Sequence, residues 1–544
     1  MKRLMTICFL ASMVLSIWSI PASRKGVVVQ QSDGTSLVVY PHGDEYFHWI
    51  ENEQGEWLKK DSNGMYNIVE PLSSEAIAQL RISSPKRVVQ EQHKSYPLNI
   101  APRGLVILVS FADKAFATDK AEMDSMMLGA NYTRSYQYRY LNQVYKISSQ
   151  GSARQYFYDS SFGQYNPQFD VVGPVTISNN MEYYGQNDNR GNDKYASTMV
   201  KEACLVADTA YNIDFSQYDN DKDGKVDFVY IIYAGYGEAD SYIENTIWPH
   251  AYKLSYDRIN VSIDGKKIDS YACGNEINYT SKLHDGIGTF CHEFSHVLGL
   301  PDIYPTNGDT HRTHASWDIM DYGPYNNDSN TPPSYSAYER FFVGWLTPTQ
   351  LTDTGTYTLS SLLSSNQAYL VAESTHNLIG NDPSPATFYL LENRQLTGWD
   401  SYLYGHGMML TRIQYNYSSW YNNTPNDDAK RLGIDLIEAD GIVPKYSSYS
   451  SDYYGKPGDL FPTGATKYTF SETMLNDIKE INGQIQFSYT SAHLTDITLT
   501  PSSQSIIAIY DMLGNKQNTI QVSDLGKGVY IIQSDSGNKK IVIP

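Results

Sequence analysis

The pattern of apolar and polar positions divides the chain into a mixed centre with β-rich segments on either side. Residues 24–99 carry short alternating runs between turn signals such as Ser32-Asp33-Gly34, which is typical of a small β module. From Arg103 a continuous apolar run predicts a buried strand, and residues 226–233 predict another. Helical segments follow, and alternating strands return after Trp345. The pattern therefore predicts a multidomain α+β protein.

The first residues have the pattern of a secretory signal. Lys2 and Arg3 precede an apolar run at residues 4–20, and the small residues Ala22 and Ser23 follow. An uncleaved membrane anchor is the alternative, but the run is short for a spanning helix, and no later segment is long enough to cross a bilayer. We therefore expect a signal peptide at residues 1–23 and an exported protein without a transmembrane segment after its removal.

Composition agrees with an extracellular protein and excludes some partners. The 544 residues exceed what one core usually organises, so several domains are expected. The formal net charge of −19 and the pI near 5.0 argue against binding nucleic acid or anionic lipid. Once Cys8 leaves with the signal, Cys204, Cys273 and Cys291 allow at most one disulfide. Core packing and bound ions must therefore supply the stability.

Residues 292–302, His-Glu-Phe-Ser-His-Val-Leu-Gly-Leu-Pro-Asp, carry the candidate chemistry. On a helix, His292 and His296 lie on one face and can reach a single zinc ion, while Glu293 points toward the same space. The glycine that follows can take the left-handed conformation that ends a helix, so the chain turns back near the metal. Asp302 then arrives as the expected third ligand.

The third ligand has competitors. His311, His314 and Glu339 are also within plausible reach of a site built on this helix, and the sequence does not rank them cleanly. Asp302 is favoured because its spacing matches the extended metzincin pattern, in which this position is often His and sometimes Asp. Glu339 would instead suit the zinc peptidases that take a Glu from a later helix.

The expected chemistry is hydrolysis by zinc-activated water. Three protein ligands leave a fourth position for water, and zinc lowers the pKa of that water to about 7. Glu293 would take the proton and return it to the leaving amine. Downstream, Met320 and Tyr322 resemble the Met-turn of metzincin zinc peptidases, in which the Met forms an apolar floor under the metal. Tyr322 is therefore a candidate to stabilise the oxyanion.

The β module at residues 24–99 ends in a polar stretch, residues 83–96, with few groups that could build a core. This stretch predicts an exposed linker that a protease could cut. The module is then a propeptide, or alternatively an accessory binding domain. It contains no cysteine, which excludes latency through a thiolate on the zinc. A carboxylate, a histidine or steric cover would have to block the site.

A second ion site is indicated by residues 219–227, which place carboxylates at alternate positions around a permissive glycine. Such hard oxygen ligands suit calcium. The segment departs from an EF-hand, because Tyr230 stands at the twelfth position instead of a bidentate Glu. A solvated Asp-Gly turn is the alternative to a structural ion. The candidate ligands are Asp219, Asp221, Asp223, Lys225 and Asp227.

The assembled motifs resemble the immune inhibitor A family of secreted metallopeptidases. The resemblance covers roughly residues 100–465 and rests on segments that occur in the same order. They are residues 219–227 and the strand after them, Ile247–His250, Gly286–Gly288, the zinc segment, Gly344–Leu346, Leu391–Gln395, Gly398–Asp400, Gly405–Gly407 and Glu438–Gly441. It implies a metzincin-like zinc endopeptidase with a propeptide and bound calcium. The site residues that it implies are His292, Glu293, His296 and Asp302.

The C-terminal residues carry a different signal. Ile507–Asn515, Leu525–Ile532 and Lys539–Val542 resemble a type IX secretion sorting domain, expected as a small antiparallel sandwich with glycine turns. The resemblance implies export by the type IX secretion machinery, followed by release or attachment to the cell surface. An ordinary β module that binds carbohydrate or protein is the alternative.

Together these patterns predict five segments. They are a signal peptide (1–23), a β-rich propeptide (24–99), a zinc metallopeptidase domain with a mixed sheet and an active-site helix (100–350), a β-rich accessory domain (351–490) and a sorting domain (491–544), the last two as β-sandwiches. We expect a monomeric zymogen, secreted or on the cell surface, that hydrolyses extracellular proteins. The alternatives are an adhesin or glycan-binding protein, against which the intact Glu293 argues, and a metalloprotease directed to mucin-type glycoproteins.

Overall fold

The computed structural model describes residues 18–23, 25–45, 47–73, 76–77, 101–188, 191–446, 451–471, 473–491, 506–511, 515–519, 525–526, 528–534 and 537–543. The chain divides into two compact units. The first holds residues 1–350, 358–466 and 478–486, and the second holds residues 351–357, 467–477 and 487–544. Most of the expected signal peptide, residues 1–17, and the whole expected linker at residues 83–96 lie outside the described residues.

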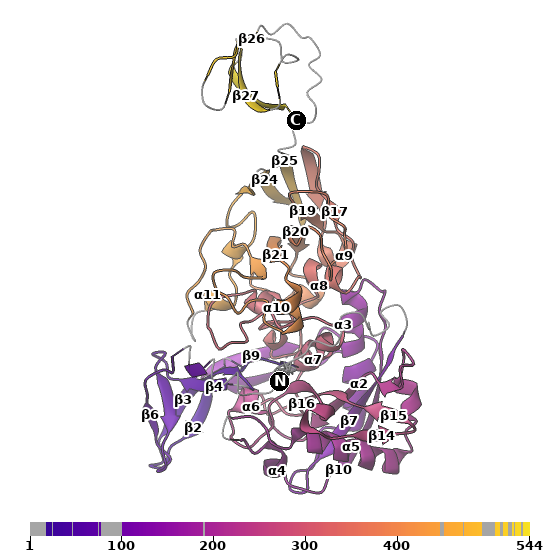
Figure 1. The fold of residues 1–544 in the computed structure, drawn as a ribbon. Coiled ribbons are helices and arrows are strands. Elements are labelled where there is room, and N and C mark those ends of the chain that lie inside the picture. Colours follow the sequence, from indigo (N-terminus) through magenta and orange to yellow (C-terminus); the bar gives the residue numbers. More distant parts are fainter. Residues whose placement is uncertain are drawn as a thin grey trace, which may run out of the picture. The chain divides into compact units, whose positions relative to one another are not determined.

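A six-stranded mixed sheet forms the core of the first unit (Figure 1). In spatial order its strands are β1 (Trp18–Ser19), β13 (His250–Lys253), β16 (Ser270–Asn275), β12 (Val229–Tyr233), β7 (Arg103–Ser110) and β10 (Gln168–Thr176). The strands from β16 to β10 are parallel, whereas β13 pairs antiparallel with both β16 and β1. The buried strand predicted from Arg103 is confirmed, and the strand predicted at residues 226–233 begins at Val229.

Helices cover both faces of this sheet, because its central strands are apolar on both sides. Alternate residues of a strand point to opposite faces. Leu105, Ile107 and Val109 of β7 therefore join one core cluster, and Val106 and Leu108 join the other. All five are completely buried. Burying one such side chain stabilises the folded state by about 1.5–3 kcal/mol. The first cluster includes α5 (Ala196–Tyr211), and the second includes α2 (Lys120–Leu128), α3 (Ala153–Ser160) and α7 (Gly288–Val297).

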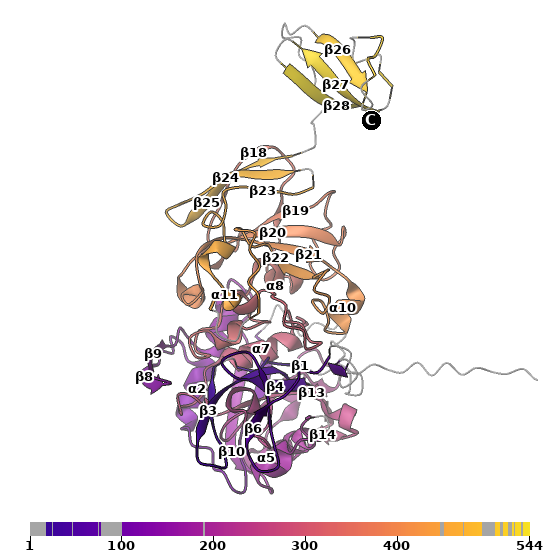
Figure 2. The same cartoon turned by 90° about the vertical axis from the view of Figure 1, so that its left-hand side faces the viewer.

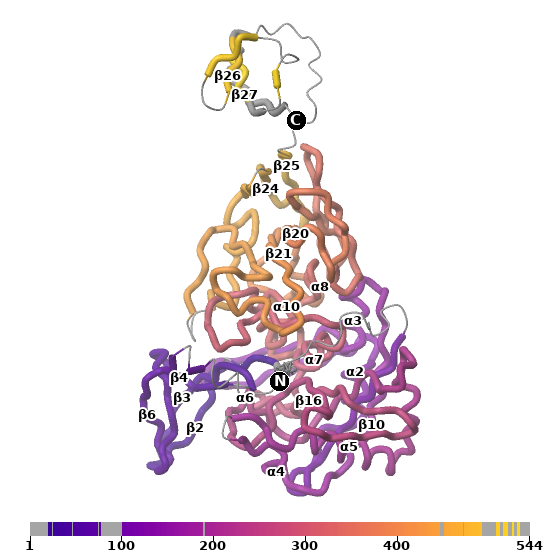
Figure 3. Tube along the Cα trace, in the orientation of Figure 1, coloured from indigo at the N-terminus to yellow at the C-terminus, as the bar shows by residue number. Residues whose placement is uncertain are grey.

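The N-terminal β module is a five-stranded antiparallel sheet whose strands follow the order of the sequence (Figure 3). Its strands are β2 (Val27–Gln30), β3 (Ser36–Asp44), β4 (Phe47–Glu51), β5 (Trp57–Lys60) and β6 (Tyr66–Ile68). A separate antiparallel hairpin is made by β8 (Ser135–Tyr140) and β9 (Gln143–Ser148). A three-stranded sheet joins β11 (Lys225–Val226), β15 (Lys266–Ile268) and β14 (Val261–Ile263).

Beyond residue 345 the chain is rich in strands (Figure 2). One sheet holds β17 (Thr349–Gln350), β19 (Tyr369–Val371), β20 (Thr387–Arg394), β21 (Gly407–Gln414) and β22 (Ile434–Leu436). Another holds β18 (Gly355–Leu359), β25 (Gln484–Thr490), β24 (Met474–Ile481) and β23 (Tyr468–Thr469). A third holds β26 (Ile506–Asp511), β27 (Gly528–Ser534) and β28 (Gly537–Ile543). The expected sandwich form of these modules stays a prediction.

Short helices complete the architecture. They are α4 (Met181–Gly185), α6 (Glu238–Ser241), α8 (Ala337–Phe342), α9 (Leu362–Ser365), α10 (Tyr417–Tyr421) and α11 (Ser451–Tyr454). The expected α+β class is confirmed. Within the described ranges no helix has both the length and the apolar character needed to span a membrane. Cys204, Cys273 and Cys291 are buried and form no disulfide.

Candidate metal centre

Helix α7 has one face packed on the sheet and another that carries the two histidines. Phe290 and Phe294, which are four residues apart, join the core cluster that covers the sheet. At the start of the helix, a Cβ on Gly288 would lie 2.0 Å from the carbonyl oxygen of Pro324, so only glycine fits there. Gly299 has a φ of +95° and follows the last turn, as predicted for the helix end.

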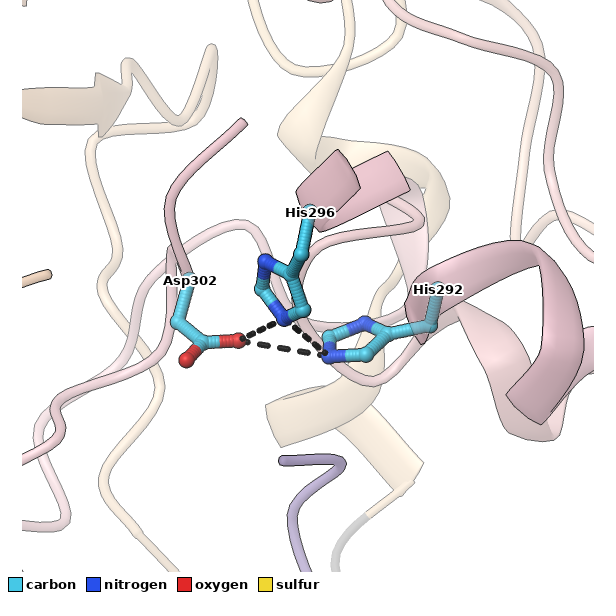
Figure 4. Close-up of side chains that lie close together, drawn as sticks. All are labelled: His292, His296 and Asp302. Atoms are coloured by element: carbon cyan, nitrogen blue, oxygen red, sulfur yellow. Dashed lines mark hydrogen bonds and ion pairs between the residues drawn. The ribbon is translucent and has the colours of Figure 1, made fainter. Parts of the chain in front are cut away.

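Three side chains converge at one point beside α7 (Figure 4). The Nε2 atoms of His292 and His296 lie 3.2 Å apart. Oδ1 of Asp302 lies 3.2 Å from the first of these nitrogens and 3.3 Å from the second. The three residues are at most 4% exposed to solvent. The structure thus brings Asp302 to the same point as the two helical histidines.

Main-chain carbonyls orient both imidazole rings. Nδ1 of His292 lies 2.8 Å from the carbonyl oxygen of Ile319, and Nδ1 of His296 lies 2.9 Å from that of Leu300. A ring that donates its Nδ1–H to a carbonyl keeps its Nε2 lone pair available for a metal. Burial lowers the pKa of His296 to about 4, so this ring is neutral, as a metal ligand must be.

The spacing of the three atoms fits a tetrahedral zinc ion. Zinc binds imidazole nitrogen and carboxylate oxygen at about 2.0–2.2 Å, so ligand atoms in a tetrahedral site lie about 3.3–3.5 Å apart. The three separations here are 3.2, 3.2 and 3.3 Å. Two histidines and one carboxylate also form the type of ligand set that leaves a fourth position for water.

Asn423 holds the carboxylate from a distant part of the chain. Its Nδ2 donates a hydrogen bond to Oδ2 of Asp302 at 2.5 Å, and its Oδ1 accepts one from the Asp302 main-chain N–H at 2.7 Å. The residue is 1% exposed and follows helix α10. These two bonds fix the carboxylate so that its other oxygen faces the histidines. The sequence analysis missed Asn423, because no local pattern links two positions 121 residues apart.

The loop after helix α10, which contains Asn423, also supports the segment that follows Asp302. Nδ2 of Asn426 donates to the carbonyl oxygen of Ile303 at 2.8 Å. The main-chain N–H of Thr306 donates to Oδ1 of Asp427 at 2.7 Å. The centre therefore depends on residues well beyond position 345.

The three competing ligands lie outside the triangle. Nε2 of His311 contacts the carbonyl oxygen of Asn426 at 2.8 Å, and Nδ1 of His314 lies 3.3 Å from Oδ2 of Asp318. Glu339 forms a capping box with Ser336 at the start of α8. Burial and the charge of Asp318 raise the pKa of Glu339 well above its usual value.

The remaining predicted catalytic residues lie around the centre. Glu293 is completely buried on α7, next to the first histidine. Met320 is also completely buried, and it directly follows the carbonyl of Ile319 that orients His292. Tyr322 is only partly buried and lines a cavity of about 260 Å³, so the structure does not place it in the metal triangle.

The N-terminal segment lies against this region. The carbonyl oxygen of Pro21 accepts a hydrogen bond from the Tyr325 hydroxyl at 2.5 Å, and that of Ile20 accepts one from Nε1 of Trp248 at 3.1 Å. Burial, with charges that include that of Glu293, raises the pKa of Tyr325 well above its usual value. Strand β1, just before this segment, is an edge strand of the central sheet and pairs with β13.

The acidic loop at residues 219–227 gathers three carboxylates. One oxygen each of Asp219, Asp221 and Asp223 lie within 4.8 Å of one another. Gly224 has a φ of +90° and donates its N–H to Asp219 at 3.1 Å. These oxygens are close enough for one hard cation.

The other two predicted calcium ligands have different neighbours. Oδ2 of Asp227 accepts two hydrogen bonds from Asn220, at 2.6 and 2.8 Å, and burial raises the pKa of Asp227 to about 6. Nζ of Lys225 lies 3.0 Å from Asp223, and Nζ of Lys266 lies 2.6 Å from Asp219. The two ammonium groups therefore offset part of the negative charge of the loop.

The fold and the site define a class of protein. A helix on a mixed sheet presents two histidines and a glutamate, and the chain returns to supply a carboxylate at metal-binding distance, which is the arrangement of a metallopeptidase catalytic domain. Residues 99–345 match the immune inhibitor A peptidase M6 catalytic domain. This segment of the chain is therefore similar to the catalytic domain of the immune inhibitor A family of peptidases.

Two relatives illustrate the similarity. Immune inhibitor A of Bacillus thuringiensis subsp. alesti is 28% identical over 215 residues, which are 35% of this chain and 31% of that protein. The pre-pro-metalloprotease PrtV of Vibrio cholerae serotype O1 (strain M66-2) is 27% identical over 217 residues, which are 35% of this chain and 23% of that protein. The chain thus spans less than a third of the length of these relatives.

Proposed function

We propose that the chain is a secreted zinc endopeptidase that hydrolyses peptide bonds of extracellular proteins. The observation that carries this proposal is the triangle of His292, His296 and Asp302, with Glu293 next to it on the same helix. When bound, zinc would supply a coordinated water with a pKa of about 7 and polarise the substrate carbonyl.

The protein groups then have separate roles. Glu293 accepts the proton of the attacking water and passes it to the leaving nitrogen. The carbonyls of Ile319 and Leu300 hold the histidine rings, and Asn423 holds the third ligand. Tyr322, on the wall of the neighbouring cavity, would donate a hydrogen bond to the oxyanion.

Metal removal tests this proposal directly. The purified protein should contain about one zinc ion per chain, as expected for a site with three protein ligands. Incubation with a zinc chelator should abolish digestion of casein, and adding back zinc should restore it. Zinc content is measured by atomic emission and digestion by release of soluble peptides. Digestion that continues in the metal-free protein would contradict the proposal.

The N-terminal module at residues 24–99 acts as a propeptide in this proposal. The burial of the metal residues, and the ion pair of Lys25 in this module with Asp328 of the catalytic domain, support steric cover as the means of latency. The module would be released by cleavage within residues 83–96. A C-terminal sorting domain at residues 491–544 would direct export through the type IX secretion machinery, and the accessory residues 351–490 would support the catalytic domain.

A structural calcium ion in the acidic loop is also part of the proposal. The clustered oxygens of Asp219, Asp221 and Asp223 support it, with Lys225 and Asp227 as the other candidate positions. Calcium at 100 times its dissociation constant should stabilise the fold by about 2.7 kcal/mol.

Thermal unfolding with increasing calcium checks this prediction. The melting temperature of the wild type should rise, whereas that of Asp219→Asn should rise much less. Asp208→Asn, on the neighbouring helix α5, serves as the control and should respond like the wild type. An equal response of all three proteins would exclude calcium from this loop.

A further inference from the structure

Lys25 lies in a pocket of aromatic and acidic groups beside the candidate catalytic centre. Its Nζ forms an ion pair with Oδ1 of Asp328 and lies 2.9 Å from the hydroxyl oxygen of Tyr138. The same ammonium lies 4.9 Å from the ring centre of Tyr145 and 5.7 Å from that of Tyr138. A cation is therefore held by one carboxylate and two aromatic faces at once.

The pocket is built from segments far apart in the chain. Tyr138 and Tyr145 face each other across the β8–β9 hairpin, with ring centres 5.0 Å apart. The side chain of Asp328 is 1% exposed, and its Oδ2 accepts a hydrogen bond from Tyr136 at 3.2 Å. A carboxylate held at such depth by hydroxyl donors is ready to receive a cation without rearrangement.

Two more buried carboxyl groups lie close enough to Asp328 and Lys25 to respond to the charge in this pocket. Burial and the nearby charge of Asp328 raise the pKa of Asp285 to about 7. Burial and the charge of Asp285 raise the pKa of Asp240 to about 8. Lys25 acts in the opposite direction, because its positive charge lowers the pKa of Asp285. The pocket thus has more acidic than basic groups. Its net charge therefore depends on the cation that enters it.

The pocket opens into the cavity that Tyr322 lines. Lys25, Asp328, Tyr322 and Tyr325 all line this space of about 260 Å³. A peptide that follows this cavity past Tyr322 and Tyr325 can therefore place one side chain in the acidic pocket.

We propose that this pocket is a specificity site for a lysine or arginine side chain of the substrate, and that Lys25 occupies it in the latent protein. This inference rests on the proposed peptidase function. When the N-terminal module leaves, Asp328 and the hairpin tyrosines are vacated and can bind a basic residue of an extended substrate. Selection follows because a neutral or acidic side chain would leave the buried carboxylate without a cation.

Binding can be measured without turnover. The full chain carrying Glu293→Gln is loaded with zinc and nicked within residues 83–96, and the new termini are verified by mass spectrometry. Fluorescent peptides carry lysine, arginine, norleucine or glutamate, moved one position at a time along an otherwise constant sequence. At one position, lysine and arginine should bind at least about tenfold more tightly than norleucine, the uncharged chain of similar shape.

Asp328→Asn in the same background should reduce that ratio to about one while leaving norleucine binding within a few-fold of its original value. Asparagine tolerates the left-handed backbone at this position, where φ is 56°. Asp124→Asn removes another lysine-paired aspartate, with Lys120, and should keep the tenfold ratio. Tyr138→Phe removes only a hydroxyl and should lower the ratio to a value between one and ten. This variant tests the proposed pocket if Asp328→Asn fails to fold.

The two hypotheses fail in different ways. A preference for basic residues that is unchanged in Asp328→Asn or Tyr138→Phe would contradict the proposal that this pocket binds a basic side chain. Equal binding of lysine and norleucine at every position would contradict it as well. Hydrolysis by the zinc-loaded Glu293 protein is measured separately with the same peptides. If no peptide is cleaved, the peptidase function fails, whereas the binding data still report on the pocket.

Discussion

Replacing Glu293 by Gln should lower peptide hydrolysis by about a thousandfold or more while leaving zinc bound. The two side chains have almost the same shape, so helix α7 and the positions of His292 and His296 should not change. The neutral amide cannot accept the proton of the attacking water, and no proton can then be passed to the leaving nitrogen. The expected result is an intact metal centre without turnover.

The measurement combines kcat/KM on a fluorogenic peptide with zinc content and melting temperature. Glu182→Gln, an exposed residue of helix α4, is the control and should retain full activity. Loss of zinc together with activity would show that Glu293 supports the metal rather than the proton transfer. Unchanged behaviour toward a target protein would instead favour an adhesin that only binds its partner.

Replacing Asn423 by Ala should weaken zinc binding by about 10–100-fold, the usual effect of removing a residue that holds a metal ligand. The change removes both hydrogen bonds to Asp302 and leaves the buried main-chain N–H of that residue without its partner. The carboxylate is then free to rotate away from the two histidines. Activity at limiting zinc should fall with the affinity, and excess zinc should restore most of it.

Competition with a chromogenic chelator measures the zinc affinity. Asn422→Ala is a matched control, because among the residues that the structure describes the Asn422 side chain bonds only to Ser418, within its own helical turn. Asn423→Asp should be worse than Asn423→Ala, since a carboxylate cannot donate to Asp302 and repels it. Zinc affinity equal to that of the wild type in both Asn423 variants would remove the proposed positioning role.

Glu293, Asp302 and Asn423 differ in how far the sequence could predict them. Glu293 was predictable because the spacing of two histidines on a helix is determined by the backbone of that helix alone. Asp302 could only be favoured over other candidates for the third ligand. Gly299 reverses the chain locally, but several later residues could have reached the same point. Asn423 was not predictable, because its contact with Asp302 depends on how β20, β21 and α10 fold around the catalytic segment.

The sequence by itself determined the elements whose cause is local. The buried strand β7, the face of α7, the left-handed turn at Gly299 and the cluster of Asp219, Asp221 and Asp223 all follow from short-range spacing. Only the tertiary structure decided which groups surround them. It brought the carbonyl of Ile319 to His292 and joined Lys25 to Asp328, 303 positions away. Contacts at such separation arise when whole elements pack to bury apolar surface, and no pattern within one segment encodes them.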